Sequence, residues 1–209
     1  MLETVVLFFA WVSQVAYTLC FLPQIVTNYR VKSGSGMSEL FLIAYLNLHA
    51  VTLFYVFLLN LPFAYKMCVP LQVSLILVMI IQRIWYDREQ LAKRLSLVYL
   101  SNLAILVAFI PYAIEHPMLI GHVGGWGNVV LGLLSQVPQA FKIWRERSVA
   151  GFDKSFVYIL LFAGLFEFCG AVIGGLPLQT RISSFRVMLF GALFLWQFKL
   201  FAHAHARQN

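Results

Sequence analysis

Long apolar runs, separated by short polar turns, divide the 209-residue sequence into seven segments. Each run has roughly 17–25 residues, the length that an α-helix needs to cross the hydrocarbon core of a bilayer. Glycine and proline recur in the turns, where they end the preceding helices. The pattern therefore predicts an all-α integral membrane protein with seven transmembrane helices. The predicted helices cover Val5–Asn28, Leu40–Leu61, Met67–Trp85, Leu95–Ile114, His122–Trp144, Phe156–Gly174 and Phe185–Ala204.

One short motif occurs twice, at a constant offset of 115 residues and without a gap. The copies begin at Pro23-Gln24 and Pro138-Gln139, and a basic turn containing Arg, Ser and Gly follows each. The offset maps predicted helices one to three onto five to seven and leaves the fourth as a connector. An odd number of joining helices keeps both units in the same orientation, so we expect two parallel three-helix bundles (a 3+1+3 arrangement). The expected units are a first bundle at 1–90, a connector at 91–117 and a second bundle at 118–209.

Composition and charge support the membrane assignment. The chain is 61% hydrophobic and 11% charged, with a mean hydropathy of +0.83, whereas about a quarter of the residues in soluble domains are charged. The net charge of +7 comes from basic residues in short turns between apolar runs, which indicates membrane orientation rather than nucleic-acid binding. Twelve of the 15 lysines and arginines lie in the turns after helices one, three and five or at the C-terminal end. We therefore expect a non-cytoplasmic N-terminus and a cytoplasmic C-terminus.

The sequence contains no metal-ligand cluster, no glycine-rich phosphate loop and no nucleotide-binding motif. Cys20, Cys68 and Cys169 lie far apart within apolar runs, so we expect small buried side chains rather than a disulfide framework. The sequence predicts neither an enzyme nor a bound cofactor or metal.

The two Pro-Gln pairs and their basic turns resemble the signatures of PQ-loop transporters, a family that includes cystinosin, lysosomal cationic amino-acid transporters and, more distantly, SWEET sugar carriers. Leu46-Asn47-Leu48 and Tyr86-Asp87-Arg88-Glu89 are most similar to the cystinosin-like members. The resemblance implies a secondary transporter that works by alternating access on a small polar solute, most simply an amino acid of the cystine or cationic class. Cystinosin-like carriers have a proton-accepting acid early in the helix after the second motif, but Tyr158–Phe162 contains none.

Pro23 and Pro138 are expected to interrupt helices, because each removes a backbone hydrogen bond. We expect the amides of Gln24 and Gln139 to satisfy the carbonyl groups that the prolines free. Two interpretations stay open: a pair of symmetric hinges for gating, or two static kinks.

Glu167 is the one carboxylate deep within a predicted helix, where an unpaired charge costs several kcal/mol. Gly164, Gly170 and Gly174 form a stripe of small residues that would pack against a neighbouring helix and place Glu167 inside the bundle. It would then bind a proton or a substrate amine, or serve as a structural carboxyl group.

His49 shares a helix face with Tyr45 and Thr52, and this face could line a cavity in which His49 takes part in proton coupling. Asn47 points roughly the opposite way, although the family resemblance favours it as a substrate contact. The sequence does not decide between them. Further candidate substrate-binding residues are Gln72, Trp126, Asn128 and Gln197. Lys142 is a candidate gate residue or a side chain that extends to the membrane surface.

Two other functions stay open: a SWEET-like uniporter of sugars or other metabolites, and a non-transporting seven-helix receptor. The expected partners are a small-molecule substrate, the lipid bilayer and protons, with the oligomeric state undecided. The C-terminal residues 202–209 show no tyrosine-based sorting signal, which favours a bacterial inner membrane over an endolysosomal membrane.

Overall fold

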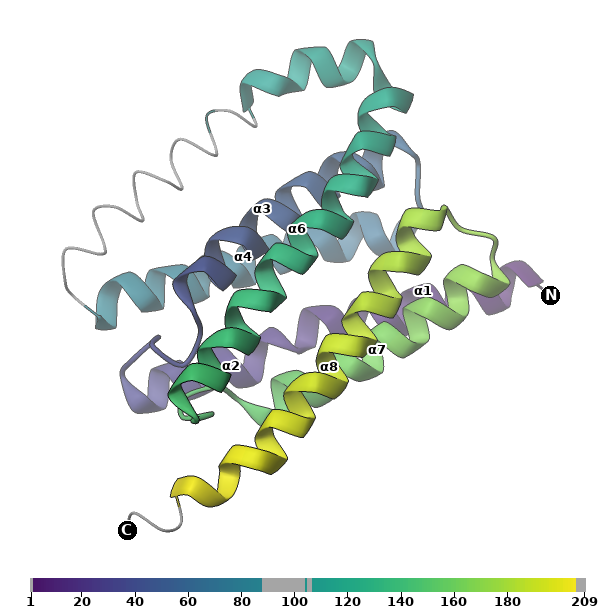
Figure 1. The fold of residues 1–209 in the computed structure, drawn as a ribbon. Helices are drawn as coiled ribbons and strands as arrows, with labels where there is room; N and C mark the ends of the chain where they lie inside the picture. The colour runs from purple at the N-terminus through teal and green to yellow at the C-terminus, as the bar shows by residue number, and fades with distance from the viewer. Residues whose placement is uncertain (1, 88–103, 105–106, 206–209) are drawn as a thin grey trace.

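The computed structural model describes residues 2–87, 104 and 107–205, and these residues form a bundle of long helices (Figure 1). Most of the predicted fourth helix, Leu95–Ile114, and most of the connector 91–117 lie outside the described residues. Residues 107–115, which are described, are helical. The helices are α1 (Leu2–Leu19), α2 (Phe21–Val31), α3 (Glu39–Leu58), α4 (Phe63–Tyr86), α6 (Pro117–Glu146), α7 (Lys154–Ile173) and α8 (Leu178–His205).

Six segments of the described chain are long and apolar enough to cross a membrane, with α1 and α2 together making the first of them. This finding confirms the prediction of an all-α integral membrane protein. The ends of several helices differ from those predicted. α8 begins at Leu178 rather than Phe185, because the mostly polar residues 179–184 lower the local hydropathy without ending the helix. α6 begins at Pro117 rather than His122, because Pro117 takes the first position of the helix, where its missing N–H leaves no helical bond unmade.

The six segments form a closed ring. The helices α1 to α4 make up the first repeat, or copy, and the helices α6 to α8 make up the second. Within the first copy α4 packs between α1 and α3, and within the second copy α8 packs between α6 and α7. The two copies meet twice, where α3 packs on α6 and where α1 packs on α7. All six segments therefore face a common centre.

The loops that follow the two motifs have matching local structures. Lys32 and Arg147, which are 115 residues apart, end α2 and α6 in the left-handed conformation, with φ values of 51° and 48°. Ser38 and Asp153 then begin α3 and α7 as N-caps, each accepting a hydrogen bond from a backbone N–H of the next turn. We call residues 32–38 and 147–153 the motif loops, and the end of the bundle at which they lie the motif end.

An apolar cluster fills the motif end beneath these loops. Met37 and Phe152, which are equivalent under the 115-residue offset, are 1% and 4% exposed. Phe41 and Phe156, another equivalent pair, belong to the same cluster and are fully buried. This packing leaves the polar interior of the ring further from the motif loops.

Candidate functional site

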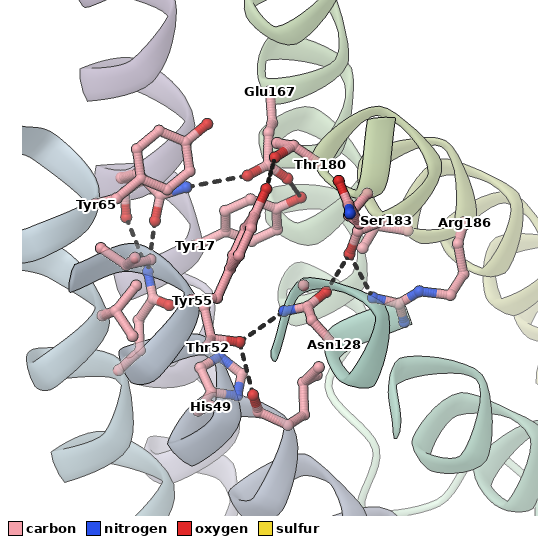
Figure 2. A pocket seen from close by; sticks show the side chains of 18 of the residues that line it. Tyr17, His49, Thr52, Tyr55, Tyr65, Asn128, Glu167, Thr180, Ser183 and Arg186 are labelled. Carbon is pink, nitrogen blue, oxygen red and sulfur yellow. Dashed lines mark hydrogen bonds between the residues drawn. The ribbon is translucent and has the colours of Figure 1, made fainter. Parts of the chain in front are cut away.

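A cavity of about 70 Å³ lies within the ring, and each of the six segments contributes to its lining (Figure 2). Fifteen of its 20 lining residues carry a polar group in the side chain. A polar cavity inside apolar helices is costly to form, so it indicates a site for a polar solute. The polar lining residues are Gln14, Tyr17, Tyr45, His49, Thr52, Tyr55, Tyr65, Gln72, Asn128, Gln136, Glu167, Gln179, Thr180, Ser183 and Arg186.

Glu167 enters the cavity from α7 and is held by α1. The Tyr17 hydroxyl donates to Oε2 of Glu167 at 2.9 Å, and the Gln14 amide donates to Oε1 at 3.3 Å. The glycine stripe on α7 explains this placement, because Gly170 lies against Phe9 of α1 and Gly164 lies against Val187 of α8. The close packing brings the carboxyl group to the inner face of the ring.

Arg186 enters from α8, where it is 6% exposed. Its guanidinium donates to Gln136 Oε1 at 2.8 Å and to Ser183 Oγ at 3.0 Å. Among the residues that the structure describes, no carboxylate lies within ion-pair distance of Arg186, and its Nε has no hydrogen-bond partner. The cavity therefore contains a cation whose charge is not compensated by a direct contact.

Hydrogen bonds extend from Arg186 across the boundary between the two motif copies. Ser183 Oγ donates to Asn128 Oδ1 at 2.6 Å, and the Asn128 amide donates to Thr52 Oγ1 at 2.6 Å. The hydroxyl groups of Tyr55 and Thr180 form a second connection, at 2.6 Å. These contacts join α3 of the first copy to α6 and α8 of the second, as Figure 2 shows.

The structure places His49 on the lining and Asn47 away from it. Tyr45, His49 and Thr52 all line the cavity, as the shared helix face predicts. His49 Nδ1 lies 2.9 Å from the Tyr45 carbonyl oxygen, which orients the imidazole. Asn47 instead donates to the Ile43 carbonyl oxygen of its own helix at 2.9 Å.

The other predicted substrate-binding residues divide in the same way. Gln72 and Asn128 line the cavity. Trp126 is 46% exposed and not part of the lining, and Gln197 is buried against the Ala140 carbonyl oxygen at 2.9 Å. The helical faces of these two residues, rather than their helices, account for the difference.

The sequence predicts Tyr45 at the cavity but does not identify Arg186, Tyr17, Tyr55 or Tyr65, which also line it. Hydropathy predicts that the seventh helix begins at Phe185, which places Arg186 among the basic residues that flank the membrane. With α8 starting at Leu178, Arg186 lies more than two turns into the helix. A signal was available: Gln179, Ser183 and Arg186 recur at helical spacing and mark one polar face.

The two motif glutamines connect the copies at the motif end. Gln24 donates to the Gly151 carbonyl oxygen at 2.8 Å, and its Oε1 accepts from the Asp153 backbone N–H at 2.9 Å. Gln139 makes the equivalent bonds to the first loop, donating to the Gly36 carbonyl oxygen at 3.2 Å and accepting from the Ser38 N–H at 2.6 Å. Each glutamine therefore holds the loop of the other copy.

These bonds correct one prediction. We expected each glutamine amide to satisfy a carbonyl group freed by its proline. The Gln24 amide instead bonds Asn28 Oδ1 and Gly151, and the Gln139 amide bonds Gly36. The backbones also meet directly, since a Cβ on Gly36 would lie 2.0 Å from the Gly151 oxygen.

The two prolines occupy different local structures. The first membrane segment is interrupted at Cys20, which places Pro23 in the first turn of α2, where a missing N–H leaves no helical bond unmade. Pro138 lies inside the continuous helix α6. Lys142, one turn further along α6, donates to the Ser35 carbonyl oxygen of the first motif loop, with Glu146 Oε2 4.0 Å away.

The ring of membrane helices, its two equivalent motif loops and its central polar cavity define the class of protein, a membrane protein built from two repeats. The PQ loop repeat family model matches residues 5–65 and 120–180, which together make up more than half of the chain. The two matches are themselves 115 residues apart. The chain therefore belongs to the PQ-loop family, as its motifs predicted.

A curated relative supports the cystinosin-like assignment within the family. Cystinosin from Drosophila melanogaster is 24% identical to this chain over an alignment of 240 residues. The alignment covers 96% of this chain and 59% of the relative. The chain thus spans about three fifths of the length of that relative.

Proposed function

We propose that this protein is a secondary transporter that moves a small amino acid across a membrane by alternating access. The observation that carries the proposal is a polar cavity between two repeats that is closed at the motif end by reciprocal contacts. Gln24 and Gln139 bond the opposite loops, and Gly36 packs on Gly151. Opening this end requires the same small set of bonds to break in both repeats, which suits a two-state change of access.

The cavity and the closed end have different roles in this proposal. The solute binds among the polar side chains at the centre of the ring. Gln24 and Gln139, with Pro23 and Pro138 beside them, control access from the motif end. Lys142 adds a contact between α6 and the first motif loop at the same end. An enzyme is not proposed, since the PQ-loop family match and the cystinosin relative both favour transport.

We further propose that transport is coupled to protons through Glu167. The family position early in α7 has no acid, whereas Glu167 lies within the same helix and lines the cavity. Groups from other helices face it: Tyr17 and Gln14 from α1, with Tyr65, His49 and Arg186 elsewhere in the lining. A carboxyl group held by two neutral donors can bind and release a proton without breaking an ion pair.

Uptake into proteoliposomes, with and without an imposed pH gradient, tests both proposals. The panel contains neutral amino acids, lysine, arginine, cystine, glucose and sucrose. Because a proton and a solute amine would exchange at the same carboxylate, we expect a gradient that is acidic inside the vesicles to stimulate amino-acid uptake in the wild type. It should have no effect in Glu167→Gln, which keeps the shape of the side chain. Glu3→Gln, an exposed position near the start of α1, is the matched control and should keep the gradient dependence.

Three outcomes would contradict parts of the proposal. Gradient-stimulated uptake that persists in Glu167→Gln would remove Glu167 from coupling. Gradient-independent uptake of sugars would indicate a uniporter of the SWEET type. Binding of a solute without uptake of any would indicate a receptor.

A further inference from the structure

Two charged side chains line the cavity, and they are held separately. Glu167 projects from α7 and Arg186 from α8, and Figure 2 shows them apart from each other. They do not form an ion pair, since the ion pairs found in the described part of the chain are Arg83–Asp87 and Lys142–Glu146. Opposite charges in a cavity of low dielectric attract strongly. Because these two side chains are held apart, each lacks a partner of opposite charge within the described ranges of the chain.

The Arg186 end of the cavity is built to hold an anion. The side chain is more than nine-tenths buried, and Gln136 and Ser183 fix two of its nitrogens. Nε faces no acceptor in the described residues. A planar guanidinium with donors in reserve matches a carboxylate group, which it can bind through two parallel hydrogen bonds.

The Glu167 end offers acceptors for a cationic group. The carboxylate oxygens accept from Tyr17 and Gln14, and an oxygen acceptor has room for more than one donor. An ammonium group, with three donors and a positive charge, matches these acceptors. The proton that we assign to Glu167 and an ammonium group would compete for the same carboxylate, so the proton leaves as the solute binds.

We propose that the cavity is a site for a small zwitterion of zero net charge, with its carboxylate on Arg186 and its ammonium group on Glu167. This inference rests on the proposed transport function and specifies its substrate class. A neutral α-amino acid with a short side chain completes both interactions. Lysine or arginine would bring a second positive charge, for which the described lining has no second carboxylate.

The size of the cavity gives an independent reason. Its volume of about 70 Å³ is less than half of the roughly 150 Å³ apolar cavity that holds benzene in an engineered protein. A short side chain such as that of alanine suits this space better than cystine, which has two amino-acid halves. The site thus favours small neutral amino acids over the cystine and cationic classes that the family resemblance implied.

Binding to the purified 209-residue protein in lipid nanodiscs tests the proposal through ligands that lack one charge each. The probes are L-alanine, L-alaninamide, which lacks the carboxylate, and L-lactate, which lacks the ammonium group. L-lysine and L-cystine test charge and size. We expect alanine to bind at least tenfold more tightly than each of the other four, by isothermal titration calorimetry.

Paired variants assign each charge to its residue. In Arg186→Gln, the preference for alanine over alaninamide should fall from at least tenfold towards one, while Arg186→Lys should keep part of it. In Glu167→Gln, the preference for alanine over lactate should fall in the same way. Arg181→Gln, on the same helix but outside the lining, is the matched control and should keep both preferences.

The measurement separates failure of this inference from failure of the transport proposal. Alaninamide or lysine binding as tightly as alanine would overturn the inference in the wild type alone, even if the Arg186 variants do not fold. An unchanged alanine-to-alaninamide ratio in a folded Arg186→Gln protein would also overturn it. Alanine binding with the expected ratios but without uptake would support the zwitterion site and refute transport. Sugar uptake without alanine binding would support transport and refute the zwitterion site.

Discussion

Arg186 lies directly against the backbone of α6, because Gly132 leaves space for its guanidinium. A Cβ at position 132 would lie 2.0 Å from Cζ of Arg186, well inside any real contact distance. Gly132 is therefore a positioning residue for the charge that we assign to the solute carboxylate. Its backbone conformation is ordinary helix, so the absence of a side chain, rather than flexibility, is what the site requires.

Gly132→Ala is expected to weaken alanine binding at least tenfold, since the methyl group displaces the guanidinium from Gln136 and Ser183. The substitution itself favours the helix, because alanine in a helix interior is about 1 kcal/mol better than glycine. Weaker alanine binding with unchanged or higher thermal stability would show that the substitution displaces Arg186 without destabilising the fold. Gly127→Ala, where the new Cβ meets the Val51 side chain at 3.1 Å, is the control. Unchanged alanine affinity in Gly132→Ala would refute this role for the glycine.

For a single residue, the sequence predicts the helix face that it occupies better than its depth in the membrane. The spacing of Tyr45, His49 and Thr52 places them on one face, and they do line the cavity. Hydropathy places Arg186 at the membrane boundary, because it predicts too late a start for a helix whose first residues are polar. The pairing of Glu167 with Gln14 and Tyr17, which are about 150 residues away, depends on how the helices pack and leaves no local pattern.

Each motif loop is held by a glutamine of the opposite repeat. A substitution of that glutamine should therefore loosen the loop of the other repeat. Gln139→Leu removes the acceptor of the Ser38 N–H, and Gln24→Leu removes that of the Asp153 N–H. A buried group left without its partner costs about 1–3 kcal/mol, which corresponds to a roughly 5- to 150-fold larger population of the open loop. We therefore expect faster amide exchange at residues 32–38 in Gln139→Leu and at residues 147–153 in Gln24→Leu.

Hydrogen–deuterium exchange with mass spectrometry resolves these loop peptides in the same experiment. Each variant serves as the control for the other, because each should affect the distant loop more than its own. Faster exchange limited to the loop that follows the mutated glutamine would refute the reciprocal contacts.

The motifs alone predict which elements are equivalent but not how they are joined. The 115-residue offset identifies Gln24 with Gln139 and Ser38 with Asp153 in advance. We predicted that each glutamine would act within its own helix, since a proline frees a carbonyl there. The pairing across repeats depends on the close approach of Gly36 and Gly151, which only the packed ring shows.

The orientation of the whole molecule stays a prediction from its basic residues. In the sequence, 12 of the 15 lysines and arginines lie in the turns after the first, third and fifth predicted helices or at the C-terminal end. These turns include the motif loops, which should therefore face the cytoplasm. A green fluorescent protein fused to the C-terminus should fluoresce in a bacterial host, whereas an alkaline phosphatase fusion at the same site should be inactive. The opposite pattern would reverse the assigned orientation, and with it the side to which the closed motif end belongs.

The crossed glutamine bonds have a consequence for any polypeptide that carries only one of the two repeats. A polypeptide with one repeat would carry one glutamine and one loop, but neither could reach the other within the same molecule. Two such polypeptides could exchange their loops around a twofold axis and form the same four bonds, each contributing half of the cavity. Joining the halves in one chain has a benefit that a symmetric pair lacks, because the two halves can then carry different side chains at equivalent positions. Here Glu167 and Arg186 provide an acid and a cation, whereas the equivalent positions in the first repeat are Thr52 and Leu71.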